Sequence, residues 1–165
     1  MRSPPIRCYL LSLLVGVGLL ACGKGRESPA TPAVATAAAG YQDAVSRVGD
    51  VTIRASVIQT SALAQSVAAQ YGITRDDRTV LLLVAVRQGT EAQETALPAR
   101  ITATVTDLRG RRQDIAMREL RSGELLDYVG TVEVTLPDTL RFDLTIVREG
   151  GASSTMQFNR EFYPR

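Results

Sequence analysis

The sequence predicts an all-β fold, namely an antiparallel, immunoglobulin-like β-sandwich of about seven short strands with one short helix. Two observations lead to this prediction. Apolar and polar residues alternate with a period of two in several segments after residue 48, as in strands that bury one face and expose the other. Turn-forming pairs that contain Gly or Pro separate these segments, and short strands with frequent reversals are typical of sandwiches. A small closed barrel is the alternative.

Seven segments carry the strand signal. The alternation is clearest in residues 51–57, 101–105 and 140–146. Residues 80–86 are apolar throughout, which predicts a central strand covered on both faces. The three remaining candidates are defined by their apolar positions: Ile115 and Met117; Leu126, Tyr128, Val132 and Val134; Met156, Phe158 and Phe162. The expected turns are Gln88-Gly89, Arg109-Gly110, Ser122-Gly123, Pro137-Asp138 and Gly150-Gly151.

One segment departs from the period of two and predicts a helix over residues 61–71. Thr60 or Ser61 can cap its first turn. Its larger apolar side chains share one side: Leu63, Val67 and Tyr71. Gly72 can end the helix in a left-handed conformation, with Ile73 packing back against it. We expect this helix to cross one end of the sandwich.

The start of the chain has the features of an export signal. A short cationic segment with Arg2 and Arg7 precedes an apolar stretch, residues 8–20, which is shorter than the roughly 20 residues of a membrane span. The stretch ends in Leu19-Leu20-Ala21-Cys22, which resembles the bacterial lipobox. The resemblance implies that residues 1–21 are a lipoprotein signal peptide and that Cys22 carries fatty-acyl chains such as palmitate. An ordinary secretory signal with an incidental Cys is the alternative.

Residues 22–40 follow as a lipidated tether. They are rich in Pro, Ala, Gly and Thr and nearly free of large apolar side chains, so they cannot bury enough surface to fold by themselves. A short Ala-rich helix at residues 33–39 is the alternative. Gly23, and not Asp, follows Cys22, which by resemblance to enteric sorting rules favours the periplasmic face of the outer membrane. Residues 41–165 then form the domain.

The charge balance argues against nucleic acid as a partner. Loss of Arg2 and Arg7 with the signal lowers the number of Lys and Arg residues from 19 to 17, which equals the 17 Asp and Glu residues. Nucleic-acid binders need a clustered basic excess. The two cysteines of the chain are Cys8 and Cys22, so the predicted domain has neither a disulfide nor a free thiol.

Catalytic chemistry is hard to build from this composition. The chain contains no His, and its only Lys is Lys24 in the tether, which excludes Ser-His-Asp, Cys-His and Ser-Lys centres and His-ligated zinc. The neighbouring acids Asp76 and Asp77, and the pair Glu124 and Asp127, are expected to be solvated. Met117 and Met156 are in phase with core positions, so we interpret them as packing residues. We therefore predict no enzyme activity, catalytic residue, cofactor or metal.

The candidate interaction residues are Arg109, Arg111, Arg112 and Tyr163. The three arginines lie at a predicted hairpin tip near Asp107 and Asp114. The simpler interpretation is a solvated turn with local ion pairs, which contribute little energy; the functional one is a contact point for an acidic partner. Tyr is common at interfaces. Tyr128 is in phase with the core, whereas Tyr41 and Tyr163 are expected to be exposed.

Two functional hypotheses follow. The first is a non-enzymatic envelope lipoprotein, anchored in the membrane by lipid, whose sandwich offers a sheet edge or loop end to another envelope protein. The second is a periplasmic carrier that holds a small ligand in an apolar cleft under the helix of residues 61–71. A pocket lined by Leu63, Val67 and Ile73 would support the carrier.

The chain also resembles a known family. The motifs that carry the resemblance are Val48-Gly49-Asp50, Tyr71-Gly72-Ile73-Thr74-Arg75, the strand from Leu81 to Val86, Ser122-Gly123-Glu124, Leu140-Arg141-Phe142 and Glu161-Phe162-Tyr163-Pro164. Their order over residues 44–164 is similar to that of the small exported gammaproteobacterial proteins catalogued as domain of unknown function 4426. The resemblance implies a periplasmic all-β domain without an assigned activity. Relatives tend to have aromatic, His or Asn residues in the first strand, where this chain has residues 52–56, so no site residue is carried over.

Overall fold

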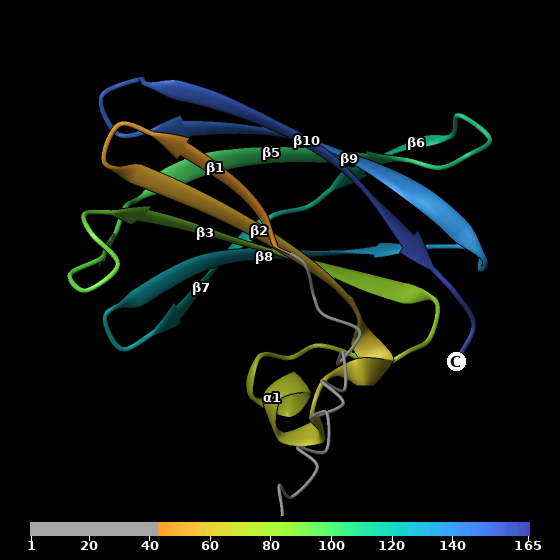
Figure 1. The fold of residues 1–165 in the computed structure, drawn as a ribbon. Helices are drawn as coiled ribbons and strands as arrows, with labels where there is room; N and C mark the ends of the chain where they lie inside the picture. Colours follow the sequence, from red (N-terminus) through yellow and green to blue (C-terminus); the bar gives the residue numbers. More distant parts are fainter. Residues whose placement is uncertain (1–42) are drawn as a thin grey trace, which may run out of the picture. The chain divides into compact units, whose positions relative to one another are not determined.

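The computed structural model describes residues 43–165, which form ten β-strands in two antiparallel sheets packed face to face (Figure 1). The all-β sandwich predicted from the sequence is therefore confirmed. The predicted signal peptide, Cys22, the tether and Tyr41 lie outside the described residues.

The larger sheet has six strands and the smaller sheet has four. The larger one has the order β1 (Ala44–Val48), β2 (Val51–Gln59), β3 (Thr79–Gln88), β8 (Leu125–Glu133) and β7 (Arg118–Ser122), with β4 (Thr95–Ala96) paired to the end of β3. The smaller one has the order β10 (Ser153–Phe162), β9 (Asp138–Arg148), β5 (Ala99–Thr106) and β6 (Arg112–Ile115).

The seven predicted strands are present, and three more were not predicted. The sequence missed β1 and β7 because both are edge strands with mostly exposed or half-buried residues, so they have no apolar face that would alternate. It missed β4 because this strand has only two residues. The segment predicted around Ile115 and Met117 is correct only in its first part, since β6 ends at Ile115.

The core lies between the inner faces of the two sheets. Its fully buried side chains include Ile53, Leu82, Phe142 and Ile146. Tyr128 is also buried, as predicted, and its hydroxyl accepts the N–H of Ala99 at 2.7 Å, which links β8 of one sheet to β5 of the other. The prediction of a strand covered on both faces is correct for the first part of β3, because Leu81 on its outer face is as buried as its core residues.

The predicted helix over residues 61–71 is wrong as one continuous element. The chain forms a 3₁₀ turn, Thr60–Ala62, and then a short helix, α1 (Gln65–Gln70). Leu63 and Ala64 between them are extended, with ψ of 143° and 139°, and neither helix has a side-chain cap. Ala68, and not Val67, is the buried residue of α1.

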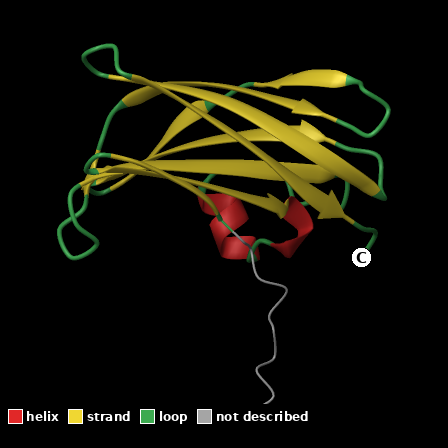
Figure 2. Cartoon of the chain, turned by 45° about the horizontal axis from the view of Figure 1, so that its top comes forward, coloured by secondary structure: helices red, strands yellow, loops and turns green. Residues whose placement is uncertain are grey.

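The predicted end of the helix is confirmed. Gly72 has a φ of 63°, and the N–H of Ile73 donates to the carbonyl of Ala68 at 2.8 Å, which is a Schellman motif. The short helix lies beside the outer face of the larger sheet at one end of the sandwich (Figures 1 and 2). The guanidinium of Arg118 on β7 holds it there by donating to the carbonyl of Tyr71 at 2.7 Å.

The chain passes from the smaller to the larger sheet directly over Gly130. A Cβ at this position would lie 2.6 Å from Cγ2 of Ile115, 2.8 Å from the carbonyl oxygen of Ala116 and 2.8 Å from Sδ of Met117. Ile115 ends β6, and Ala116 and Met117 form the link from β6 to β7. The absent side chain therefore leaves the space through which the link crosses β8.

We predict that Gly130→Ala lowers the free energy of unfolding by about 1–3 kcal/mol, because the new methyl group overfills the crossing. The sign of this change tests the close crossing, since replacing glycine by alanine within a strand otherwise stabilises a protein by roughly 0.5–1 kcal/mol. Urea unfolding would measure the change. Thr145→Val, at an exposed position of β9, is the control, with a change within about 0.5 kcal/mol expected. An increase in stability for Gly130→Ala would contradict the close crossing.

Candidate functional site

Two consecutive polar residues are buried where β2 ends. The side chain of Gln59, which is 6% exposed, donates from Nε2 to the carbonyls of Asp77 at 3.1 Å and Tyr163 at 3.0 Å. Its Oε1 accepts Nε–H of Arg165 at 3.1 Å. One amide group thus joins β2, the segment before β3 and the segment after β10.

Thr60 completes this arrangement. It is fully buried, and its hydroxyl accepts the N–H of Asp76 at 2.9 Å and donates to the carbonyl of Asp76 at 3.0 Å. The N–H of Ser61 donates to the same carbonyl at 3.2 Å. Buried polar groups are costly unless they are paired, so these bonds hold the backbone of Asp76 against the end of β2.

Two neighbouring hollows open at this end of the sandwich. The larger one, of about 810 Å³, lies between the segment after α1 and the outer face of β3 and β8. Its buried floor contains Leu81 and Val129. The smaller one, of about 490 Å³, is bounded by Arg111, Gln113, Leu136, Pro164 and Arg165. Arg78 and Glu133 line both, so the two hollows adjoin each other.

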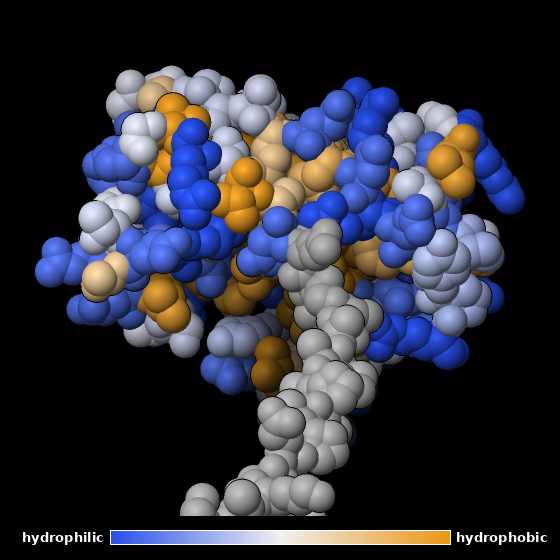
Figure 3. Space-filling view, viewed as in Figure 1, coloured by the Kyte–Doolittle hydropathy of each residue, from blue (hydrophilic) through white to orange (hydrophobic). Residues whose placement is uncertain are grey.

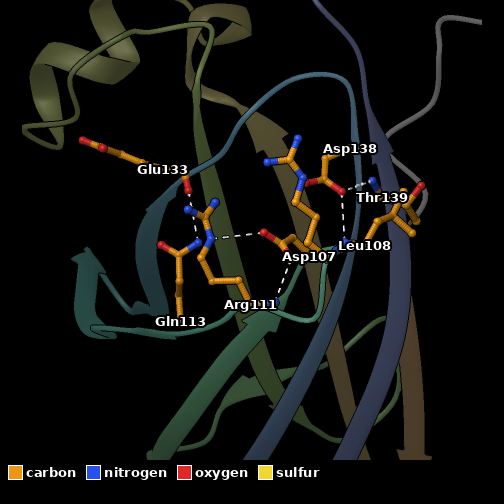
Figure 4. A network of polar contacts seen from close by, with 8 residues as sticks. Asp107, Leu108, Arg111, Gln113, Glu133, Asp138 and Thr139 are labelled. Carbon is orange, nitrogen blue, oxygen red and sulfur yellow. Dashed lines mark hydrogen bonds and ion pairs between the residues drawn. The ribbon is translucent and has the colours of Figure 1, made fainter.

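The loop from β5 to β6, residues 107–111, borders the smaller hollow and is organised by Asp107 (Figure 4). The carboxylate of Asp107 is 3% exposed. It accepts the backbone N–H groups of Arg109 at 3.0 Å and Arg111 at 2.8 Å, and Nε–H of Arg111 at 3.1 Å. The sequence predicted a solvated turn with local ion pairs; the turn and the ion pair of Asp107 with Arg111 are present, but the carboxylate is buried and not solvated.

Every backbone N–H of this loop has an acceptor. Besides the two bonds to the Asp107 carboxylate, the N–H of Asp107 donates to the carbonyl of Arg111 and that of Gly110 to the carbonyl of Asp107. The N–H of Leu108 donates to Oδ1 of Asp138, which also accepts the N–H of Thr139. The loop is therefore held in one conformation, although the side chain of Leu108 at its tip is 74% exposed.

Hydrogen bonding controls the charge of Asp107. The backbone N–H of Arg111 has the largest effect, and together with the N–H of Arg109 and the charge of Arg111 it lowers the pKa of this carboxyl below its ordinary value, against the opposing effect of burial. Asp107 is thus ionised at neutral pH and forms the negative centre of a basic loop.

The structure separates the predicted interaction residues into two groups. Arg109 and Arg111 belong to the loop, and Arg111 lines the smaller hollow beside Pro164 and Arg165. Arg112 begins β6 and instead lines a hollow of about 400 Å³ on the outer face of the smaller sheet, with Asp143. The three arginines therefore do not form a single patch.

Tyr163 directly precedes Pro164, which lines the smaller hollow. Its side chain is 60% exposed, as expected from the sequence, and its hydroxyl donates to Oε2 of Glu161 at 2.8 Å. This bond and the charge of Glu161 raise the pKa of Tyr163. Its carbonyl is the one that Gln59 binds, so the aromatic ring is attached to a fixed backbone.

The acids considered in the sequence do not converge. Oδ1 of Asp76 accepts the N–H of Arg78 at 2.6 Å, Asp127 is paired with Arg87 on the larger sheet, and Glu124 is exposed in the β7–β8 hairpin. Within residues 43–165, no group of three His, Cys, Asp or Glu residues is placed to hold a metal ion.

The expected apolar cleft under the helix differs from the hollow found there. Of the three predicted lining residues, Ile73 lines the larger hollow, whereas Leu63 and Val67 do not. Val67 is exposed because α1 starts after the extended residues and turns this side chain outward. The charged residues Arg78, Arg118 and Glu133 take part in the lining instead, so the hollow is more polar than predicted.

Sequence reasoning missed Gln59 and Arg78. Gln59 follows Val51, Ile53, Ala55 and Val57 in the core phase of β2. A polar residue in an apolar register was therefore a usable signal of a buried hydrogen-bonding group. Arg78 gave no such signal, since its position depends on the folded segment before β3.

The described residues expose few large apolar side chains. Figure 3 shows hydrophilic residues over most of the viewed face. The larger exposed apolar side chains are scattered over several elements: Val45, Val48, Val67, Leu108, Leu125 and Tyr163. Among the helices of residues 43–165, none combines the length and apolar character that crossing a membrane requires.

The fold and this surface define a β-sandwich domain whose paired loops surround an open depression at one end. Residues 45–165 match the family model described as Domain of unknown function (DUF4426), and the chain belongs to this family. The resemblance noted from the sequence motifs is thereby confirmed. The family carries no assigned activity.

Solved structures with this fold support the architecture. A DUF4426 family protein from Pseudomonas aeruginosa PAO1 is 22% identical, with a TM-score of 0.64 over 74% of this chain and 96% of that chain. FetP of uropathogenic Escherichia coli strain F11, expressed recombinantly in the periplasm, is 10% identical, with a TM-score of 0.53 over 76% of this chain and 99% of that chain. A copper-bound FetP variant is 8% identical, with a TM-score of 0.50 over 74% and 95% of the respective chains. No curated protein sequence matches the chain.

We predict that Asp107→Asn destabilises the domain at neutral pH and has a smaller effect in acid. Because the pKa of Asp107 is lowered on folding, its contribution is complete above its ordinary pKa of about 3.9 and is lost as the pH falls through the folded-state value. Urea unfolding of wild type and variant at pH 7 and near pH 3 would measure the difference. An equal difference at both pH values would contradict this role of the ionised carboxylate.

Proposed function

We propose that the protein is a non-enzymatic, lipid-anchored envelope protein whose domain binds another protein through the end that carries loop 107–111. The observation that supports this most directly is the combination of a fully hydrogen-bonded loop with an exposed leucine at its tip. A loop that is already ordered loses little entropy when it binds. Its anchor side chain is available without rearrangement.

The chemistry of the loop indicates the kind of partner surface. Leu108 offers an apolar anchor, and Arg109 and Arg111 add basic groups to the same loop. A matching surface has an apolar pocket with an acidic rim, which is consistent with an acidic partner. Central apolar anchors surrounded by polar contacts are typical of interfaces.

A binding role is favoured over a catalytic one by the side chains at this end. The carboxylates of Asp76, Asp107 and Asp138 accept hydrogen bonds from backbone N–H groups, so they have a structural role. Asp107 is held ionised by these bonds, so it is a weak proton carrier near neutral pH.

The envelope location rests on the first 23 residues. The cationic segment, the short apolar stretch and the Leu-Leu-Ala-Cys junction support export and lipidation of Cys22, and Gly23 supports the periplasmic face of the outer membrane. Acylation at more than one group of Cys22 would give stable anchoring.

We predict that Cys22→Ser does not incorporate labelled palmitate and is not processed to the normal mature size, because the thiol is the acylation site. Metabolic labelling and gel mobility of the full chain would measure both effects. Cys8→Ser is the matched control and should be labelled and processed like the wild type. Normal processing and membrane recovery of Cys22→Ser would disprove the lipid anchor.

We predict that Leu108→Asp abolishes crosslinking of the full chain to its partner protein in cells, because a carboxylate replaces the apolar anchor at a cost of roughly 2 kcal/mol or more. Leu125→Asp is the control. Leu125 is also an exposed hairpin leucine, but the β7–β8 hairpin lies at the opposite end of the sandwich (Figure 1). Retention of the same partner by Leu108→Asp would contradict binding through the loop.

The alternative function is a carrier of a small ligand in the larger hollow. The volume of about 810 Å³ is within the range of ligand sites, and its charged lining favours a polar ligand over the apolar one expected from the sequence. Absence of any crosslinked partner for the wild type, together with a small molecule that copurifies with it, would favour the carrier.

A further inference from the structure

We propose that the free edge of β8 at residues 131–133 binds an extended segment of a partner protein as an additional β-strand, with an acidic side chain of that segment bound by Arg118. This inference rests on the proposed function, because it specifies how the domain binds protein. It concerns the larger hollow and the sheet edge beside it, whereas the loop at Leu108 is a separate contact.

The strand register leaves this edge open. β8 runs from Leu125 to Glu133, and β3 pairs with it up to Glu133. On its other side, β7 pairs only with Leu125–Val129, since Arg118 opposite Val129 is the first residue of β7. The last four residues of β8 therefore have a hydrogen-bonded strand neighbour on one side only, although Ile115 and Gln113 of β6 lie close to Gly130 and Glu133.

The directions of the backbone groups follow from two hydrogen bonds. The N–H of Val134 donates to the carbonyl of Arg78 at 2.7 Å, so the backbone groups of Val134 point toward β3. The carbonyl of Glu133 accepts an N–H of Gln113 Nε2 at 3.4 Å, so the backbone groups of Glu133 point away from β3. Because backbone groups alternate along a strand, those of Thr131 also point away from β3.

Three backbone groups are thus available at this edge. Among the described residues, the N–H and carbonyl of Thr131 and the N–H of Glu133 have no backbone partner. Thr131 and Glu133 are both exposed. Unpaired strand edges of this kind can accept a further chain by ordinary sheet hydrogen bonds.

The larger hollow lies in front of this edge. Thr131, Glu133 and Val129 on β8, and Leu81 on β3, belong to its lining. An added strand would direct alternate side chains onto this outer face, where Leu81 and Val129 form a buried apolar floor. Four residues of an extended strand span about 13 Å.

The charges along the hollow give the added strand a preferred polarity. Arg118 stands at one end of the open edge and Glu133 at the other, because Arg118 is paired with Val129. The Arg118 guanidinium uses one N–H group for the carbonyl of Tyr71, and within residues 43–165 it has no acidic partner. A carboxylate of the added strand near Arg118 gains an ion pair. A carboxylate near Glu133 or Asp76 is repelled by these acids, and the positive charge of Arg78 offsets part of this repulsion.

The test uses a synthetic probe with the purified full chain. The probe is an acetylated and amidated peptide of alternating Thr and Val with one Glu, and the matched peptides carry Lys instead of Glu or have N-methylated backbone amides. Amide hydrogen exchange of Thr131 and Glu133 is followed by NMR. We expect the Glu peptide to slow exchange of both amides at least about tenfold at saturation, because they become hydrogen-bonded, and to leave Val132, which points toward β3, unchanged.

Side-chain and backbone variants separate the parts of the proposal. Arg118→Gln should weaken binding of the Glu peptide by about tenfold and change binding of the Lys peptide little or in the opposite direction. Thr131→Pro, which removes the N–H at the free edge, should abolish protection at Glu133, whereas Thr131→Val retains the N–H and should behave like the wild type. The N-methylated peptide should not bind.

Three outcomes would overturn the inference. The first is that no peptide changes the exchange rates of the Thr131 and Glu133 amides, and the second is that the Glu and Lys peptides bind equally. The third is that these amides are already protected without peptide, which would mean that another part of the chain covers the edge. A different result would contradict the proposed function itself, namely the absence of any crosslinked partner in cells. A partner that crosslinks near Leu108 without protection of Thr131 would leave protein binding intact and reject strand addition.

Discussion

The close passage of the β6–β7 link over Gly130 is the contact on which the rest of the structure depends. It allows the chain to leave the smaller sheet after Ile115 and to enter the larger one at Arg118. Since the link occupies the inner side of β8 at this point, it cannot also extend β7 along the edge of β8. The same crossing that joins the two sheets therefore leaves residues 131–133 unpaired on one side and opens the larger hollow beside them.

The depression at this end also requires polar groups to be buried at the end of β2. Gln59 and Thr60 attach the segment after α1 and the segment after β10 to the end of β2. Removing one partner from such a network leaves the others buried and unpaired, which costs more than the bond itself contributes. Two neighbouring side chains thus position two walls of the site, although neither faces a ligand.

The sequence predicted the strands in which apolar residues recur regularly. It did not predict the strands that form only because they pair with a neighbouring strand. The strands around Ile53, Val84 and Phe142 could be predicted because burial of one or both faces leaves a pattern in the sequence. Edge strands β1 and β7 could not, because few of their side chains are buried. The sequence identified the arginines of the hairpin tip. It could not show that Asp107 orders them by hydrogen bonds or that Arg112 is separated from Arg111, because both features depend on where β6 begins. The register of β7 against β8, which defines the open edge, has no counterpart in local sequence.

An open strand edge is a risk for a β-domain, since it can pair with any extended chain, including another copy. Here the unpaired part is short and the residues around it are exposed and charged at both ends, with Arg118 before it and Glu133 within it. Short length and flanking charge are the features that protect edges from uncontrolled association. They also restrict which segment can bind, because an acidic side chain is favoured beside Arg118 and repelled beside Glu133. The same side chains that limit self-association therefore give the edge its selectivity for a partner strand.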